Sequence, residues 1–153
     1  NADRSLNYYP WCVCNGKPTS CKSQQSVPEQ VYIQLGAADV VVASFVTFEA
    51  ELPSAPPQGI LTAPDGTNST ITGVAHWYTT SHASGTPRNY VLNFVRFAGL
   101  TSRATYKYTV KSGSVNATWS KTYTFRAPYR AEDGGETRVA LYGDMGNTQF
   151  NNQ

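Results

Sequence analysis

From Pro28 onward, the chain alternates between short segments rich in β-branched and aromatic residues and clusters of turn residues. Alternation at this interval is typical of the strands and turns of a β-sandwich. We predict strands at residues 30–35, 40–48, 59–63, 69–78, 88–97, 105–111, 120–126 and 137–142. The pattern contains no helical period. The segments before residue 127 suffice for one sandwich of about seven strands.

Turn residues separate these segments where a sandwich reverses its chain. Residues 53–57 contain three prolines, and residues 64–67 and 84–87 each combine proline with glycine. Proline fixes φ near the value that many turns require, and glycine adopts the positive φ that other residues avoid. The sequence therefore predicts an all-β, fibronectin-III/immunoglobulin-like sandwich over residues 28–127.

Tyr106 stands just after the start of a predicted strand that follows a polar loop. In a sandwich, a tyrosine at this place buries its ring and returns its hydroxyl to the backbone a few residues upstream, which pins the corner between the sheets. We predict Tyr106 to be this structural corner. Trp119, just before the last strand of the sandwich, is predicted to be a core or sheet-edge aromatic, not a ligand platform.

The balance of charge argues against nucleic acid as a partner. The 153 residues include 12 basic and 10 acidic side chains, a formal net charge of +2, without a run of like charges. No apolar stretch approaches the roughly 18–20 residues that cross a bilayer, so we expect no membrane span. The few charged residues and the many Tyr, Thr, Ser, Asn, Gly and Val are typical of extracellular β-proteins.

Two Asn-x-Ser/Thr sequons begin at Asn68 and Asn116. Each lies in a polar segment that we expect to be a surface turn, where a glycan can be attached in the secretory pathway. Together with the composition, the sequons lead us to expect a secreted, extracellular glycoprotein.

Three cysteines, Cys12, Cys14 and Cys21, all lie in an irregular N-terminal leader, residues 1–27. We favour a local disulfide that joins Cys21 to Cys12 or Cys14, with the third cysteine pairing elsewhere. A zinc site is the alternative, but it needs four ligands, and no histidine or further cysteine lies at ligand spacing.

The composition changes after Arg126. Residues 128–136 are polar and glycine-containing, as an interdomain linker would be. A short apolar segment, residues 137–142, then runs into Gly-Asp-Met-Gly. This order places Asp144 at the carboxyl end of a strand, where open α/β sheets gather their ligands and where a metal ion finds carboxylate oxygen. Taken alone, the motif favours a plain turn after a strand.

The order of these features resembles the purple acid phosphatases, metallophosphoesterases with an N-terminal fibronectin-III-like sandwich and a C-terminal catalytic domain. The residues that carry the resemblance are, in order, 28–36, 41–47, 100–106, 119–120, 125–128 and 139–146. The pattern departs from the family at Phe45, where members usually have Trp, and in the leader, which matches no family motif. Residues 137–153 would be the incomplete start of the metallophosphoesterase domain.

The resemblance implies that the intact protein hydrolyses phosphate monoesters at a di-metal centre of iron with zinc, manganese or a second iron. It carries over only Asp144, as the first carboxylate ligand of that centre, because the sequence ends at Gln153 before further ligand motifs. His76 and His82 match no metal motif of the family. The segment would then supply a scaffold and one metal ligand, and it would be inactive alone. Its partner would be the remainder of the catalytic domain, and a homo-oligomer is compatible with the resemblance.

Two alternatives stay open at this point. The chain could be a non-catalytic extracellular sandwich, used as an adhesion, matrix or filament subunit whose last strand pairs with a neighbour. It could also belong to a homologue of the phosphatases in which the metal ligands have decayed.

Overall fold

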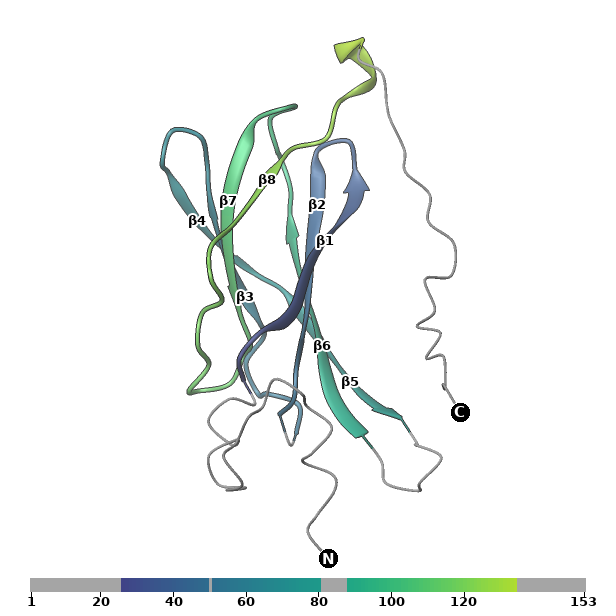
Figure 1. Ribbon diagram of the computed structural model, residues 1–153, viewed down its shortest axis with the longest axis vertical. Coiled ribbons are helices and arrows are strands. Elements are labelled where there is room, and N and C mark those ends of the chain that lie inside the picture. The colour runs from purple at the N-terminus through teal and green to yellow at the C-terminus, as the bar shows by residue number, and fades with distance from the viewer. Residues whose placement is uncertain (1–25, 50, 81–87, 135–153) are drawn as a thin grey trace, which may run out of the picture.

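The computed structural model describes residues 26–49, 51–80 and 88–134 (Figure 1). The strands are β1 (Glu29–Ala37), β2 (Val40–Thr47), β3 (Gln58–Thr62), β4 (Asn68–Thr72), β5 (Val74–Thr80), β6 (Arg88–Phe97), β7 (Thr105–Lys111) and β8 (Tyr123–Arg126). A short 3-10 helix, η3 (Ala131–Asp133), follows β8. The predicted strand at 137–142 lies outside the described residues.

The strands form two four-stranded sheets that face each other as the layers of a sandwich (Figure 1). Sheet A has the order β1-β2-β6-β5 and sheet B the order β4-β3-β7-β8, and all strand pairs are antiparallel. This is the arrangement of an immunoglobulin-like sandwich, with four strands in each layer. The all-β sandwich predicted from the sequence is confirmed.

The core lies between the sheets and is filled from the inward positions of every second residue. Sheet A contributes Val41, Ala43, Phe45, Val95 and Phe97, and sheet B contributes Leu61, Tyr106, Tyr108, Val110 and Phe125. Phe45 is only 1% exposed, so phenylalanine fills this place in the core with a large ring. Burial, with a smaller contribution from Tyr123, raises the pKa of Tyr108 to about 12.

A second, polar contact joins the two sheets at the end of the sandwich where β2 and β7 finish. The Glu49 carboxylate, 8% exposed, accepts a hydrogen bond from the Ser114 hydroxyl at 2.8 Å and another from the Thr47 hydroxyl. Asn93 Nδ2 in turn donates to Thr47 Oγ1 at 3.0 Å. Because each buried polar group costs free energy unless it is paired, this chain of contacts fixes how the two sheets meet at that end.

The prediction of one strand over residues 69–78 is wrong, because the structure has two strands in different sheets. Gly73 separates β4 from β5 and donates its N–H to the Pro57 carbonyl oxygen at 2.8 Å. A Cβ at Gly73 would lie 2.1 Å from the Phe94 carbonyl oxygen, so the backbone of β6 passes where any other side chain would begin. The sheet switch depends on this close approach, which the alternation of apolar residues did not reveal.

Strand β8 begins at Tyr123, later than the prediction of residue 120. Ser120 already contacts β7, since its N–H donates to the Val110 carbonyl oxygen at 2.8 Å and its hydroxyl accepts the Val110 N–H at 3.0 Å. The Ser120 hydroxyl thus takes the place of one backbone carbonyl as a hydrogen-bond acceptor beside β7. The bounds predicted for β6 and β7 are confirmed at both ends.

We expect Gly73→Ala to lower the free energy of unfolding by about 2 kcal/mol or more, because the new methyl group forces β5 away from β6. Chemical denaturation followed by tryptophan fluorescence would measure this loss. The control is Thr72→Ala at the neighbouring exposed position, where we expect a change below about 0.5 kcal/mol. Equal effects of the two substitutions would contradict the steric account of the sheet switch.

Candidate functional site

The corner between β6 and β7 is the place where the chain crosses from sheet A to sheet B. The Tyr106 ring is 6% exposed and stacks on Phe125 with ring centres 5.7 Å apart. Its hydroxyl accepts the Thr101 N–H at 3.0 Å, five residues upstream. This is the geometry of a tyrosine corner, in which one buried ring fixes the loop that precedes it.

Arg103 completes the turn in a left-handed conformation, with φ of 61°. Such a conformation costs a non-glycine residue free energy unless surrounding contacts hold it. Two contacts do so here: the Arg103 N–H donates to the Pro128 carbonyl oxygen at 3.4 Å, and Arg126 Nε donates to the Arg103 carbonyl oxygen at 2.9 Å. The corner and the chain after β8 therefore stabilise each other.

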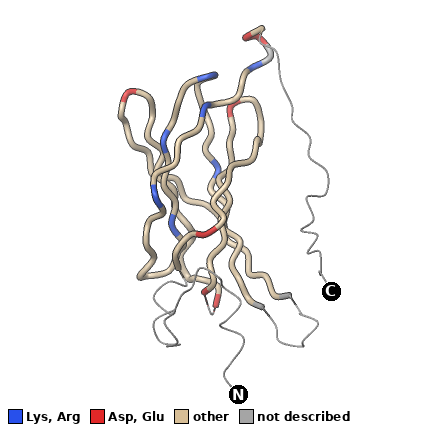
Figure 2. The backbone as a smooth tube through the Cα atoms, viewed as in Figure 1, with Lys and Arg blue, Asp and Glu red and all other residues tan. Residues whose placement is uncertain are grey.

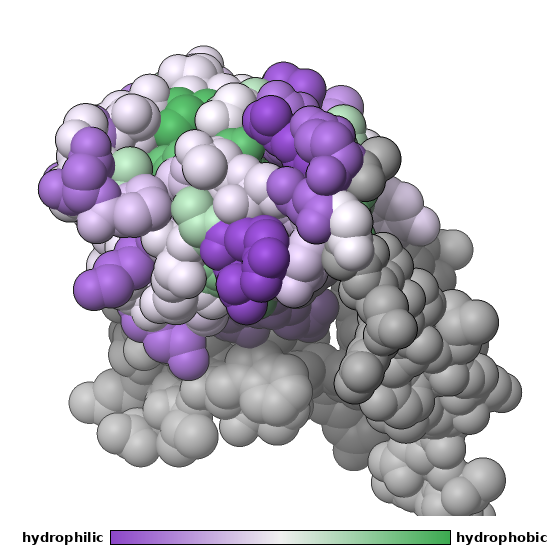
Figure 3. Space-filling view, turned by 90° about the horizontal axis from the view of Figure 1, so that it is seen from above, coloured by the Kyte–Doolittle hydropathy of each residue, from purple (hydrophilic) through white to green (hydrophobic). Residues whose placement is uncertain are grey.

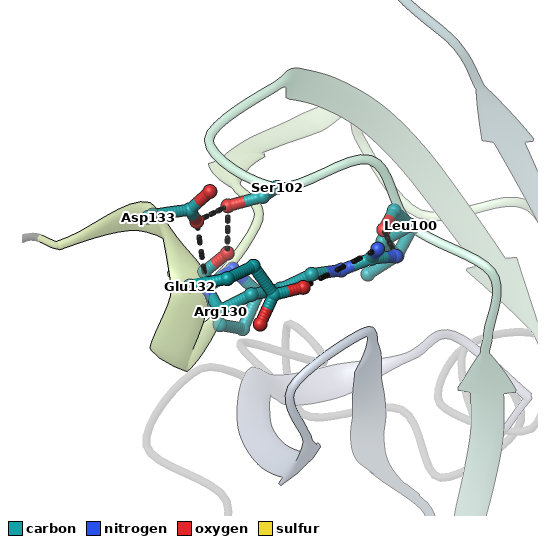
Figure 4. A network of polar contacts seen from close by, with 6 residues as sticks. Leu100, Ser102, Arg130, Glu132 and Asp133 are labelled. Atoms are coloured by element: carbon teal, nitrogen blue, oxygen red, sulfur yellow. Dashed lines mark hydrogen bonds and ion pairs between the residues drawn. The ribbon is translucent and has the colours of Figure 1, made fainter.

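The chain that leaves β8 lies across this corner and does not run free. The Ala127 N–H donates to the Ala104 carbonyl oxygen at 2.8 Å, and the Ser102 Oγ lies 3.2 Å from the Pro128 carbonyl oxygen. Arg130 Nη2 reaches the Leu100 carbonyl oxygen at 3.3 Å (Figure 4). The linker predicted at residues 128–136 is thus anchored over its first half, whereas its last two residues lie outside the described part.

Asp133 closes this arrangement from η3. Its carboxylate accepts the Arg130 N–H at 2.7 Å and a hydrogen bond from the Ser102 hydroxyl (Figure 4). These two hydrogen bonds, the Ser102 contact first, lower the pKa of Asp133, and the charges of Arg103 and Arg130 act in the same direction. We call this set of contacts between residues 100–106 and 127–133 the junction.

The junction sits at a polar end of the sandwich. Hydrophilic residues cover much of the surface seen from above, with smaller apolar areas between them (Figure 3). The ion pair between Arg130 and Glu132 spans 4.0 Å between two exposed side chains, so it adds little to the hydrogen bonds. The specificity of the junction comes from its hydrogen bonds to backbone groups.

A cleft of about 510 Å³ lies at the opposite end, lined by residues that include Ser26, Glu49, Leu52, Ser114 and Asn116. The Glu49 carboxylate faces structural partners there, as described above. Glu51 also lines the cleft, in an exposed position, and we assign the cleft no catalytic role.

The other residues singled out by the sequence are distributed as follows. Asn68 and Asn116 are both exposed, and Asn68 Oδ1 accepts a hydrogen bond from the Thr62 hydroxyl at 2.6 Å. His76 is exposed on β5, with its ring centre 5.9 Å from that of Phe94. Asp144, His82 and the three cysteines, Cys12, Cys14 and Cys21, lie outside the described residues.

Within residues 26–49, 51–80 and 88–134, no three His, Cys, Asp or Glu side chains gather into a metal site. The same part of the chain contains no helix long and apolar enough to cross a membrane. Sequence reasoning did not identify Ser102, Arg130 and Asp133 as partners. The spacing of three residues between Arg130 and Asp133, typical of a capped helix start, was the available signal.

The sheet order and the tyrosine corner define the class of the domain as an immunoglobulin-like β-sandwich. Residues 28–127 match the family model of the purple acid phosphatase N-terminal domain, and the chain belongs to that family. No curated protein sequence matches the chain.

A solved structure of a purple acid phosphatase shares the fold. Purple acid phosphatase PPD1 from yellow lupin (Lupinus luteus) seeds superposes with a TM-score of 0.56 at 16% identity, over 68% of this chain and 20% of the lupin chain. The chain thus spans about a fifth of the lupin enzyme. A myokine structure (TM-score 0.47, 18% identity) is covered over 97% of its length and 67% of this chain. Astrotactin-2, a vertebrate-specific, perforin-like membrane protein, gives a TM-score of 0.40 at 18% identity, over 24% of its chain and 76% of this one.

We expect Tyr106→Phe to lower the free energy of unfolding by about 1 kcal/mol, because it removes the acceptor of the Thr101 N–H and leaves the ring in place. Thermal or chemical denaturation would measure the loss. Tyr78→Phe is the matched control, since it removes a hydroxyl from a ring that is 47% exposed on β5. A loss no larger than that of the control would contradict the role of the corner.

The junction should also respond to acid in a defined direction. Because the pKa of folded Asp133 is below its ordinary value, the contribution of the carboxylate is present above about pH 4 and is lost as the pH falls through the lowered value. We expect the protection of the Arg130 amide, its exchange rate relative to the intrinsic rate at the same pH, to be lost over that interval, and mildly acidic pH to leave the junction intact. In Asp133→Asn this acid-dependent step should disappear; a step of unchanged size would show that another group controls the amide.

Proposed function

We propose that the chain is the N-terminal scaffold of a secreted, purple-acid-phosphatase-like enzyme that hydrolyses phosphate monoesters. The observation that carries this proposal is the family match over residues 28–127. The junction supports it, because a domain that positions a following catalytic domain needs a fixed exit for its chain. The contacts of Ser102, Arg130 and Asp133 provide such an exit.

In this proposal, catalysis belongs to the part of the protein that follows the junction. A di-metal centre, iron with zinc, manganese or a second iron, would supply a metal-activated nucleophile and charge stabilisation for the phosphoryl group. Asp144 would be one of its ligands, and the segment alone would be inactive. The described residues assemble no metal ligand set, so we assign them positioning and no chemical step.

The same proposal covers the other secretory features. Asn68 and Asn116 are exposed and would carry glycans, and a disulfide within the leader would involve Cys21 and either Cys12 or Cys14. A homo-oligomer is compatible with this arrangement. These assignments are testable by mass spectrometry of the secreted protein before and after deglycosylation and reduction.

The decisive experiment uses the full-length protein that contains this chain. We expect it to hydrolyse a phosphate monoester such as p-nitrophenyl phosphate and to contain about two metal ions per chain. Asp144→Asn should lower metal content and reduce activity by at least about 100-fold. Asp65→Asn, in the exposed turn between β3 and β4, is the control and should change neither.

One result would overturn the proposal, and another would correct only the assignment of Asp144. A full-length protein that binds no metal and hydrolyses no phosphate monoester would support a homologue with decayed ligands or a non-catalytic sandwich. Metal binding and activity that survive Asp144→Asn would remove Asp144 from the metal site while leaving the enzyme class intact.

A further inference from the structure

The outer faces of the two sheets have opposite chemical character. In sheet B, the outward positions of β7 and β8 carry Thr105, Lys107, Thr109, Lys111, Thr124 and Arg126. Lys and Arg accordingly gather along the layer that contains β7 and β8 (Figure 2). The neighbouring strands β3 and β4 add Gln58, Thr62, Asn68, Thr70 and Thr72, and only Ile60 is apolar. This is the ordinary composition of a solvent-facing sheet surface.

Sheet A presents the reverse pattern. Because residues opposite each other in an antiparallel pair share a face, the register places the following side chains on its outer face: Glu29, Tyr32, Gln34, Val42, Ser44, Val46, Val74, His76, Tyr78, Tyr90, Leu92, Phe94 and Arg96. We call this set the apolar face. Most of its members are aliphatic or aromatic, and Glu29 and Arg96 carry full charges at neutral pH.

The apolar face is partly open. Tyr32, Val74 and Tyr78 are 49%, 57% and 47% exposed, and the rings of Tyr78 and Tyr90 lie 4.9 Å apart. Ser44, at its centre between Tyr32 and Phe94 in the register, is only 2% exposed. Monomeric soluble proteins rarely expose apolar patches of more than a few hundred Å², and larger ones mark interaction sites.

The junction holds the last described residues near one end of sheet A. Strand β8 is an edge strand of sheet B, yet η3 lies beyond the turn between β1 and β2, on the side away from β4 (Figure 1). The contacts trace the same path: Arg130 Nη2 donates to the Leu100 carbonyl oxygen, and the Leu100 N–H donates to the carbonyl oxygen of Asp39, in the β1–β2 turn. The chain after Gly134 therefore starts from the end of sheet A.

We propose that the apolar face is the docking surface for the part of its own chain that follows Gly134, the catalytic domain of the proposed phosphatase. This inference rests on the proposed function for the identity of the occupant. A tethered partner has an effective concentration in the millimolar range, so it occupies the face ahead of a free partner or a second copy. The occupant presents an apolar surface, and the basic outer face of sheet B stays in solvent.

Hydroxyl-radical footprinting of the full-length protein tests the contact directly, since tyrosine and histidine are oxidised readily when exposed. We expect Tyr32, His76 and Tyr78 to be oxidised about fivefold more slowly in the full-length protein than their exposure in the sandwich alone implies. About fivefold is the difference in exposed area between a half-exposed and a buried side chain. Leu52, 48% exposed outside the apolar face, is the internal reference and should show no protection.

Charge substitutions test the same surface independently. Val74→Glu combined with Tyr78→Glu places two carboxylates on β5, and Thr70→Glu combined with Thr72→Glu places two on β4, likewise an edge strand. We expect the first pair to split the thermal unfolding of the full-length protein into two transitions, because charges cannot be buried unpaired, and the second pair to leave the transition unchanged. Splitting by both pairs, or by neither, contradicts the proposal.

Footprinting also separates this proposal from the proposed function. Reactive Tyr32 and Tyr78 in a monomeric, active phosphatase would overturn the docking surface and leave the enzyme class intact. Protection that appears only with a concentration-dependent dimer would assign the face to a second copy instead. Protection in a monomer without phosphatase activity would support the docking surface and overturn the enzyme.

Discussion

The hydrogen bond from the Thr101 N–H to the Tyr106 hydroxyl is the contact on which the rest of the structure depends. It fixes the loop that carries the chain from sheet A to sheet B, and the Tyr106 ring extends the core to that loop through Phe125. The chain after β8 then lies on the same loop through Ser102 and Arg103. One buried ring thus positions both the corner of the sandwich and the exit of the chain.

The two outer faces of the sandwich differ in polarity. Sheet B has the threonine and lysine surface of a sheet that faces water, whereas sheet A has an apolar one. The junction leads away from sheet B toward the end of sheet A. For a domain that belongs to the purple acid phosphatase N-terminal family, this asymmetry suits a scaffold that holds a partner on one side and leaves the other side free.

The sequence was sufficient to predict the sandwich, because the alternation of apolar and polar residues along β6 and β7 shows directly which side chains face the core. The sequence did not predict the break between β4 and β5 at Gly73, since this break depends on the close approach of the Phe94 carbonyl oxygen, in a strand far along the chain. The tyrosine corner has a local signature, whereas the junction joins Ser102 to Asp133 across 31 positions. Contacts of this kind follow from tertiary packing, and no local pattern of polar residues specifies their partners.

The exchange rate of the Thr101 amide proton in heavy water, followed by NMR, is the most direct test of this account. Thr101 is an exposed loop residue, so without the Tyr106 hydroxyl its amide would exchange as rapidly as any loop amide. The account predicts exchange as slow as that of amides in the central strand β7. Exchange as fast as in the loop around Val115, which is 96% exposed, would contradict it.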